Sequence, residues 1–412
     1  MCRLAMTDSI NSIKATVNDI LRGWRDLWPG GLRDEQYSTL NLMAHCRQGA
    51  LGYNLAKCED CRHREWYASS CGDRHCPNCL GPRQAEWSEK VCGRLPDCPH
   101  FHVVFTVPEQ LHEVFELNYR ILAGELFAGA AETLQLFQKN NWRMEGGFLA
   151  VLHTWGRALN WHPHLHVLVS AGGRDCATGQ WRQARPNYLF PVRSMSKVFG
   201  AILLRRIEAL EGDPEVRWPA GLDTPEIRRD WRRDLAGRHW NIFSRATLGN
   251  TRAVVRYLAR YTSRIAISNQ RIKRIDEEQR TVSFEWKDYK DGGQTKEMTM
   301  SGATFLRAFT RHMVPKRFRR IRYYGLLAGA KERHRSLPGA PAESIGEKTV
   351  KKLRPVCPSC GGCHWLYLRF NYRTARQPKS TPRTASDSAR EGRNCFSLYP
   401  PTNAPPPVQQ HG

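Results

Sequence analysis

Apolar residues recur along this chain at two different spacings, and each spacing predicts a different kind of element. Helical spacing runs through residues 8–50, where Ile13, Val17, Ile20 and Leu21 fall on one face. Unbroken apolar runs rich in β-branched residues predict strands instead. The further predicted helices are residues 110–140, 193–211, 225–236 and 251–265. The predicted strands are residues 100–108, 147–154 and 161–169, with a turn at 171–173 after the last and strand character again over 272–300.

The predicted strand 161–169 carries two histidines on one face. Because side chains alternate along a strand, His164 and His166 point one way, while Leu165 and its apolar neighbours point the other. Two imidazoles on one face offer two neutral nitrogen ligands, so the pattern predicts a divalent metal site with a third ligand from a neighbouring strand. His153 is the first candidate for that ligand, and the alternatives are His162 and His102.

A second chemical pattern lies in the predicted helix 251–265. Tyr257 and Tyr261 are four residues apart and so share a helical face, beside a stripe formed by Arg256, Arg260 and Arg264. Taken alone, the pattern favours a half-buried aromatic stripe with a solvated basic flank. Beside a metal site it predicts nucleophiles, because an ion that polarises a phosphate makes attack by a tyrosine hydroxyl feasible. The arginines would then hold flanking phosphates.

The chain has 14 cysteines, several of them clustered. Two Cys-x-x-Cys pairs separated by a short insert are typical of tetrahedral zinc, so Cys58, Cys61, Cys76 and Cys79 predict one structural zinc ribbon. Cys71 and His75, inside the insert, could replace a ligand or bind a second ion. The group Cys357, Cys360 and Cys363 has one complete pair, and we expect it to be a degenerate ribbon without zinc.

Charge adds a partner to this picture. The 412 residues include 63 Lys and Arg against 39 Asp and Glu, a net charge of +24, which favours nucleic acid. The stretch that holds Arg317, Arg319, Arg320 and Arg322 is interleaved with aromatic residues, a pattern that suits single-stranded DNA. The alternative is a solvated basic face over an aromatic core. No apolar run approaches the ~18 residues of a membrane span, and no signal peptide is evident, so we expect a bacterial cytosolic or nucleoid-associated protein that binds DNA and no membrane.

In combination these motifs resemble one known family. The chain is similar to the two-tyrosine HUH (histidine–hydrophobic–histidine) transposases of the insertion-sequence ninety-one family, over roughly residues 35–330. The departures are Arg157, where such proteins often have Gln, and Ser263, where they often have His. The residues that carry the resemblance are 70–79 in the ribbon, 152–156 before the histidine strand, His162-Pro163-His164-Leu165-His166, Tyr257-Leu258-Ala259-Arg260-Tyr261-Thr262, 265–269 and 315–325.

The resemblance implies an α+β fold with an antiparallel-sheet, palm-like HUH endonuclease domain. It implies nicking and rejoining of single-stranded element ends through a tyrosine–DNA intermediate in rolling-circle transposition. His164 and His166 would bind Mg²⁺ or Mn²⁺, and Tyr257 and Tyr261 would be nucleophiles. The alternative function is a zinc-ribbon DNA-binding protein without catalysis, such as a decayed transposase or a regulator. The expected parts are a helical segment (1–57), the zinc ribbon (58–98), the HUH domain (99–270), a basic DNA-binding region (271–345) and a degenerate cysteine cluster with a disordered tail (346–412).

Overall fold

The structure is a computed structural model, and its described residues leave out part of the chain. They are 16–79, 87–88, 90–92, 94–96, 98–185, 187–247, 255, 266–288, 291–329 and 356–370, with 369 and 370 described by their backbone only. The chain divides into two compact units, residues 1–372 and 373–412, and every described residue belongs to the first. The predicted tail beyond 370 and all of the predicted helix 251–265 except Val255 therefore lie outside the described residues.

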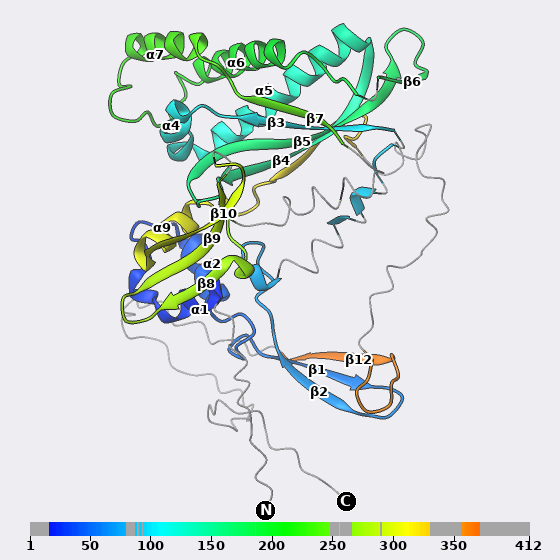
Figure 1. Ribbon diagram of the computed structural model, residues 1–412, viewed down its shortest axis with the longest axis vertical. Coiled ribbons are helices and arrows are strands. Elements are labelled where there is room, and N and C mark those ends of the chain that lie inside the picture. The colour runs from blue at the N-terminus through cyan, green and yellow to red at the C-terminus, as the bar shows by residue number, and fades with distance from the viewer. Residues whose placement is uncertain are drawn as a thin grey trace, which may run out of the picture. The chain divides into compact units, whose positions relative to one another are not determined.

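An antiparallel sheet of six strands organises the largest part of the described chain (Figure 1). Its order is β11-β4-β5-β3-β7, and β6 pairs with the end of β5. All its neighbouring strands run antiparallel. The strands are β3 (His100–Thr106), β4 (Met144–Trp155), β5 (Trp161–Asp175), β6 (Trp181–Gln183), β7 (Ile242–Ala246) and β11 (Ile321–Gly325). The strands predicted at 100–108, 147–154 and 161–169 are thus confirmed as β3, β4 and β5.

Helices cover one face of this sheet, and the apolar positions of the strands point toward them (Figure 1). Phe105, Leu165 and Val167 are fully buried there against Phe127 and Phe199 of the helices. Complete burial of such side chains contributes roughly 1.5–3 kcal/mol each, so this face anchors the sheet. The covering helices are α4 (His112–Leu117), α5 (Tyr119–Phe137), α6 (Val192–Glu208) and α7 (Pro225–Gly237).

Two sequence predictions on this sheet need correction. The helix expected over 110–140 is broken at Asn118, whose amide binds the Val114 carbonyl and both backbone groups of Arg217. The turn expected at 171–173 is instead part of β5, because β6 pairs with Gly172 and Gly173. Both glycines are needed because the Trp181 ring and the β4 backbone approach the β5 backbone closely there. A Cβ on Gly172 would lie 2.6 Å from the Trp181 ring, and one on Gly173 would lie 2.4 Å from the Glu145 carbonyl oxygen.

A second apolar core joins the N-terminal helices to a hairpin sheet from later in the chain. Leu21 and Leu40 pack in it with Phe284 and Phe305. This core is made by α1 (Val17–Gly23), α2 (Asp34–Ala44), the antiparallel strands β8 (Ile272–Asp276), β9 (Thr281–Asp288) and β10 (Gln294–Ser301), and α9 (Gly302–Arg311). The strand character predicted over 272–300 is confirmed by β8 to β10. None of the described helices is long and apolar enough to cross a membrane.

The third sheet is small and joins segments far apart in the sequence. Its order is β12-β1-β2, from β1 (Tyr53–Cys58), β2 (Arg64–Ala68) and β12 (Trp365–Phe370) (Figure 1). The expected division into five parts remains a prediction, but contacts cross its boundaries. Strand β12 pairs with β1, and β11, from the expected basic region, pairs with β4 of the expected HUH domain.

Candidate functional site: a histidine cluster on the open sheet face

Three histidines meet on the sheet face opposite the helices. His153 on β4 is paired directly with His164 on β5, and His166 is the next residue on the same face. One ring nitrogen from each lies within 4.8 Å of the others. The ring centroid of His153 is 5.3 Å from that of His164 and 4.5 Å from that of His166. The structure therefore brings together the predicted pair and the first candidate for the third ligand.

Hydrogen bonds set which nitrogen each imidazole presents. His164 Nδ1 lies 2.7 Å from the carbonyl oxygen of His162, and because a carbonyl only accepts, Nδ1 carries the proton and Nε2 carries the lone pair. His166 Nδ1 lies 2.8 Å from His102 Nε2. When His166 donates this bond, its Nε2 also presents a lone pair, 3.2 Å from that of His164. Two lone pairs that face each other at this distance are stabilised by a cation between them. The donor set thus fits a metal ion.

Burial keeps these imidazoles neutral, which is the form that binds a metal. Desolvation lowers the pKa of His164 and that of His102 to about 4 in each case. Desolvation also lowers the pKa of His166, and electrostatic repulsion from the neighbouring histidines lowers it further. At neutral pH the site consequently offers nitrogen ligands without first releasing protons.

A cavity of about 900 Å³ opens over the histidines. Its far wall comes from the β8–β10 sheet, with Trp286 and Lys287 of β9. Arg271 ties the two walls together, since its guanidinium donates to the carbonyls of Glu285, Ala266 and Arg157 at 2.6, 3.2 and 2.6 Å. The Arg157 side chain, which replaces the Gln frequent in the resembling family, lines the same cavity. The ligand nitrogens thus face a space large enough for a nucleotide-sized substrate.

The two predicted nucleophiles lie outside the described residues. Tyr257 and Tyr261 are not described, and neither are Arg256, Arg260, Arg264 or Ser263. Val255, which precedes Tyr257 by two positions, is described as helical and fully buried. It packs with Leu149, Val151 and Leu168. Val151 and Leu168 lie two residues from His153 and His166 and hence on the histidine face of the sheet.

The predicted basic stretch lies at the β11 edge of the same sheet. It lines a hollow of about 680 Å³ together with Arg94, Arg120 and several aromatic rings. Arg317 and Arg319 are exposed. The Arg322 guanidinium stacks on the Phe127 ring at 4.3 Å, and Arg94 stacks on Tyr323 at 5.1 Å. Arg320 differs, because its side chain is half-buried and desolvation lowers its pKa to about 10, and its role as a contact to DNA stays a prediction.

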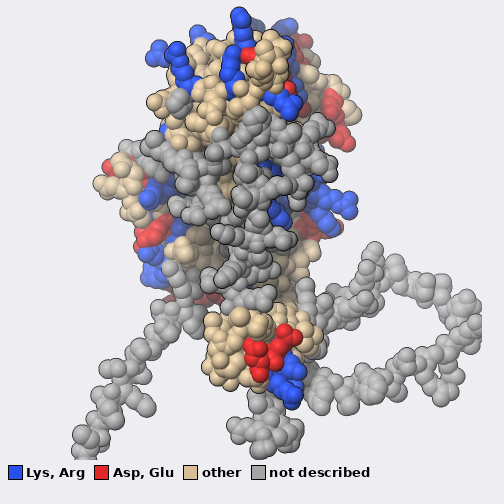
Figure 2. Space-filling view, turned by 90° about the vertical axis from the view of Figure 1, so that its right-hand side faces the viewer, with Lys and Arg blue, Asp and Glu red and all other residues tan. Residues whose placement is uncertain are grey.

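On the face drawn in Figure 2, the charge of the described residues is spread rather than concentrated. Figure 2 shows Lys and Arg side chains scattered over the described part of one face, with Asp and Glu side chains between them. On the β12-β1-β2 sheet, at the bottom of that view, acidic side chains stand next to basic ones. The hollow at β11, in contrast, brings arginines and aromatic rings together in one place.

The cysteines form two clusters, and neither is the predicted one. Cys46, Cys71, Cys76 and Cys79 come together in the core under α1 and α2, and Cys58 and Cys61 lie in a separate group with Cys357 and Cys360. The prediction that Cys58, Cys61, Cys76 and Cys79 share one ion is wrong in its grouping. Each Cys-x-x-Cys turn is local, but its partner turn is set by long-range pairing, which spacing does not encode. The Cys46–Cys79 and Cys71–Cys79 sulfur distances, 3.6 and 3.7 Å, suit a tetrahedral zinc site.

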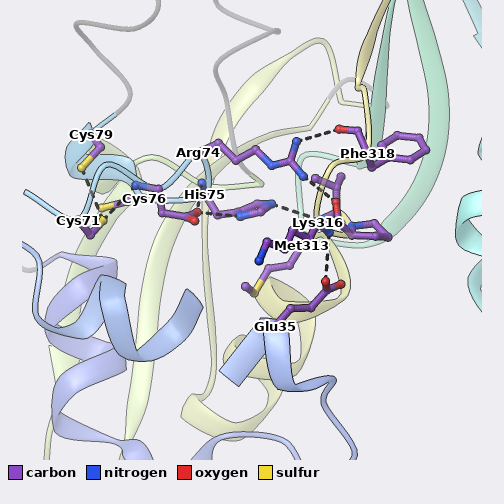
Figure 3. Close-up of polar contacts among 12 residues, drawn as sticks. Glu35, Cys71, Arg74, His75, Cys76, Cys79, Met313, Lys316 and Phe318 are labelled. Carbon is purple, nitrogen blue, oxygen red and sulfur yellow. Dashed lines mark hydrogen bonds and ion pairs between the residues drawn. The ribbon is translucent and has the colours of Figure 1, made fainter. Parts of the chain in front are cut away.

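Asp73, Arg74 and His75, between the cysteines of the first cluster, connect it to the loop before β11 (Figure 3). His75 Nδ1 donates to Asp73 Oδ1 at 2.9 Å, and its Nε2 accepts the backbone N–H of Val314 at 3.2 Å. Arg74 donates to the carbonyls of Pro315 and Phe318 at 2.7 and 2.8 Å. Both nitrogens of His75 are thus engaged away from the sulfurs, so Cys71 and not His75 completes the cluster. Arg74 thus positions the basic loop through two of its carbonyls.

A buried histidine near the cavity leads to a pH-dependent prediction. His312 contacts Thr154 Oγ1 through Nδ1 and the Leu159 carbonyl through Nε2, and desolvation lowers its pKa to about 4. The unfolded chain binds its proton near pH 6.5, so this contribution to stability is complete above that pH and is lost as pH falls toward 4. We expect His312→Gln to reduce the decrease in the free energy of unfolding at low pH by up to about 3 kcal/mol. The measurement is the free energy of unfolding in urea at pH 7, 6 and 5. If this free energy fell equally with pH in the variant and in the unsubstituted protein, the prediction would be contradicted.

Several residues of these sites were not identified from the sequence. Cys46, which no sequence motif singled out, is a member of the first cluster. Cys357 and Cys360 were expected to bind no zinc, yet they complete the second group. The Cys-x-x-Cys spacing of the C-terminal pair was a sufficient signal, because it equals that of Cys58 and Cys61. Nothing in the sequence marked Cys46.

Comparisons with known proteins agree with this arrangement. A family model described as "Transposase zinc-binding domain" matches residues 16–107, and one described as "Putative transposase" matches residues 147–335. A "Putative transposase y4qJ" from Sinorhizobium fredii is 35% identical over 371 residues, which cover 84% of this chain and 92% of that protein. The transposase for insertion sequence element IS801 from Pseudomonas savastanoi pv. phaseolicola is 34% identical over 306 residues, 73% of this chain and 72% of that one. The matched zinc-binding domain includes all four cysteines of the first cluster and supports structural Zn²⁺ there. The chain belongs to the insertion-sequence ninety-one family of transposases.

Proposed function

We propose that this transposase is an HUH-type, metal-dependent single-strand DNA endonuclease and strand transferase. It nicks and rejoins insertion-sequence ends through a tyrosine–DNA intermediate in rolling-circle transposition. The observation that carries the proposal is the cluster of His153, His164 and His166 on the open face of a helix-backed antiparallel sheet, beneath a cavity of about 900 Å³. A noncatalytic DNA-binding protein would not need three buried imidazoles directed at one point.

The three histidines would hold Mg²⁺ or Mn²⁺. Such an ion supplies Lewis-acid polarisation of the scissile phosphate. His102 acts behind the ligands, because a bond from His166 Nδ1–H to His102 Nε2 puts the lone pair of His166 on Nε2, where it can coordinate. The His162 carbonyl does the same for His164. The chain's own residues thus fix the tautomer and the orientation of both strand ligands.

Tyr257 and Tyr261 are the proposed nucleophiles. The tyrosine hydroxyl attacks the phosphorus, its proton is released, and the 3′ oxygen of the preceding nucleotide leaves as a free hydroxyl. One phosphodiester is replaced by one phosphotyrosyl ester, so the 3′ hydroxyl of another strand can reverse the step without nucleotide hydrolysis. The second tyrosine allows one strand to be held while another is cut. Val255 is helical and buried against the histidine face, which supports a position for this segment beside the same sheet.

Single-stranded DNA would reach this centre along the β11 edge. Arg317 and Arg319 are exposed to meet phosphates, and Tyr323 and Phe318 line the same hollow. Cations that follow the backbone and rings that stack on bases are the usual means of binding single strands. Arg256, Arg260 and Arg264 are proposed to add phosphate contacts near the tyrosines.

Covalent capture tests the proposal. The full chain is incubated with labelled single-stranded element ends and Mn²⁺, and the products are separated on a denaturing gel. We expect a protein–DNA adduct that persists, at a reduced level, in Tyr257→Phe and in Tyr261→Phe, and that disappears in the double variant. An adduct that survives both substitutions would sink the mechanism. Binding of the same DNA with no adduct under any divalent metal would favour a decayed transposase or a regulator.

A further inference from the structure

We propose that Cys58, Cys61, Cys357 and Cys360 hold a second structural zinc ion, which fastens a segment near the C-terminus onto the N-terminal ribbon. The two pairs are 296 to 302 positions apart in sequence. Cys357 and Cys360 lie outside both ranges matched by the family models. The site is therefore distinct from the cluster at Cys46 and from the histidine centre.

The sulfur positions fit a tetrahedral ion and not disulfides. Cys58 Sγ is 3.7 Å from Cys360 Sγ, Cys61 Sγ is 3.6 Å from Cys357 Sγ, and all four sulfurs lie within 4.8 Å of one another. A disulfide requires about 2.05 Å. Zinc with four Zn–S bonds of about 2.3 Å places its sulfurs about 3.8 Å apart. Four soft thiolates at these distances select zinc over harder ions such as Mg²⁺.

The two cysteine turns have the same backbone geometry. The Cys58 carbonyl accepts from Arg62 N, and the Cys357 carbonyl accepts from Gly361 N, both four residues on. The N–H groups of Cys58 and Cys357 donate to the carbonyls five residues on, at 2.8 Å in both turns. Arg62 and Gly361 both have positive φ, 66° and 73°. The pair that the sequence indicated to be degenerate is thus a complete copy of the first turn.

Contacts outside the sulfurs hold the two turns together. Glu59 N donates to the His364 carbonyl at 2.9 Å, and His364 Nδ1 lies 3.0 Å from Asp60 Oδ1. A Cβ on Gly362 would lie 2.0 Å from Asp60 Oδ2, so only glycine permits this approach. These contacts pre-orient the four thiols, as the outer partners of metal ligands commonly do.

Within the described part of the chain, the only buried apolar side chains of the sheet next to these turns, apart from cysteine, are Leu55 and Ala56 of β1, too few to hold it without metal. Among the described residues, none of β1, β2 or β12 contributes a side chain to the three apolar cores. Trp66, Tyr67, Leu366, Tyr367 and Leu368 are instead exposed. A small sheet of this kind is marginal in water, and a structural ion commonly supplies the missing folding free energy. We infer that β12 stays paired with β1 because zinc closes the site.

The test is the zinc content of the purified full-length chain, measured by mass spectrometry of the metal. Cys357→Ser and Cys360→Ser should each lower the zinc per chain by one relative to the unsubstituted protein. Cys363→Ser is the matched control, since Cys363 follows in the same Cys-x-x-Cys-x-x-Cys run but is outside the cluster, and it should leave the zinc content unchanged. Unchanged zinc in Cys357→Ser, or a loss in Cys363→Ser, would overturn the assignment.

Alkylation of the unsubstituted protein gives a readout that does not depend on whether a variant folds. Peptide mass spectrometry should find Cys363 and Cys176, both exposed, modified at once by iodoacetamide. Cys61 and Cys360 are also exposed, yet they should be protected until a chelator is added and should then react together with Cys58 and Cys357. Immediate modification of Cys61 and Cys360 without chelator would show that no ion is bound there.

Discussion

Replacing either strand histidine, His164→Ala or His166→Ala, is expected to lower the rate of adduct formation by roughly 10³-fold or more. Polarisation of a phosphate by a bound ion stabilises a transition state by several kcal/mol, and each 1.36 kcal/mol corresponds to a factor of ten. Each variant leaves two imidazoles, an incomplete set for holding a divalent ion. Binding of single-stranded DNA should be nearly unchanged, because the β11 hollow does not include these residues.

A graded series separates loss of the ion from loss of the fold. His102→Ala removes the partner of His166 Nδ1 but no ligand, so we expect a 10- to 100-fold loss that higher Mn²⁺ concentrations partly restore. His239→Ala is the matched control, because His239 is exposed and far along the chain from the cluster. The measurements are single-turnover adduct formation against Mn²⁺ concentration and fluorescence anisotropy for DNA binding. Nicking at the normal rate in His164→Ala would refute the assignment of this ligand.

The histidine site shows which part of a metal centre is local in sequence. Alternation along one strand is a local property, so it predicted that His164 and His166 share a face and that Leu165 faces the core. The position of the proposed third ligand depends on the register between β4 and β5, which places His153 directly opposite His164. Spacing along the chain does not contain this register, so His153, His162 and His102 could not be ranked by it. In the structure the three contribute differently. His153 places a ring nitrogen in the cluster, His162 places its carbonyl oxygen at His164 Nδ1, and His102 contacts His166 Nδ1 from behind.

For the cysteines and arginines too, the local pattern was predictable from the sequence, whereas the long-range contacts were not. Each Cys-x-x-Cys turn was recognisable, but the assignment of turns to ions required the pairing of β12 with β1 and the packing of α2 beneath Cys46. In the basic stretch, composition indicated a DNA-binding surface but could not separate exposed Arg319 from half-buried Arg320. Composition also did not reveal that the Arg74 side chain holds the loop before β11 by the carbonyls of Pro315 and Phe318, a contact between residues more than 200 positions apart.

The first cysteine cluster leads to the second large prediction: Cys46→Ser should unfold the core that α1 and α2 share with β8 to β10 and α9. Cys46, Cys76 and Cys79 are buried in the core that α1 and α2 share with β9 and α9. Asn18 Nδ2 donates to Cys76 Sγ at 3.3 Å, and Cys71 N donates to Cys46 Sγ at 3.4 Å. The ion thus stabilises a core as well as a turn. Binding of structural zinc contributes about 10–16 kcal/mol in small domains, comparable to the 5–15 kcal/mol stability of a whole protein.

Thermal unfolding and zinc content measure this effect together. We expect Cys46→Ser to lose one zinc and to show a drop in Tm of more than 10 °C or to accumulate as insoluble chain. Cys58→Ser, by contrast, should lose one zinc with a small change in Tm, because no side chain of β1, β2 or β12 belongs to the three cores of the described residues. Cys176→Ser, an exposed cysteine outside both clusters, is the control for handling. If one ion were held by Cys58, Cys61, Cys76 and Cys79 instead, Cys58→Ser would be as damaging as Cys76→Ser, and Cys46→Ser would keep its zinc. These opposite orders of severity decide between the two groupings even if some variants cannot be purified, since solubility itself ranks them.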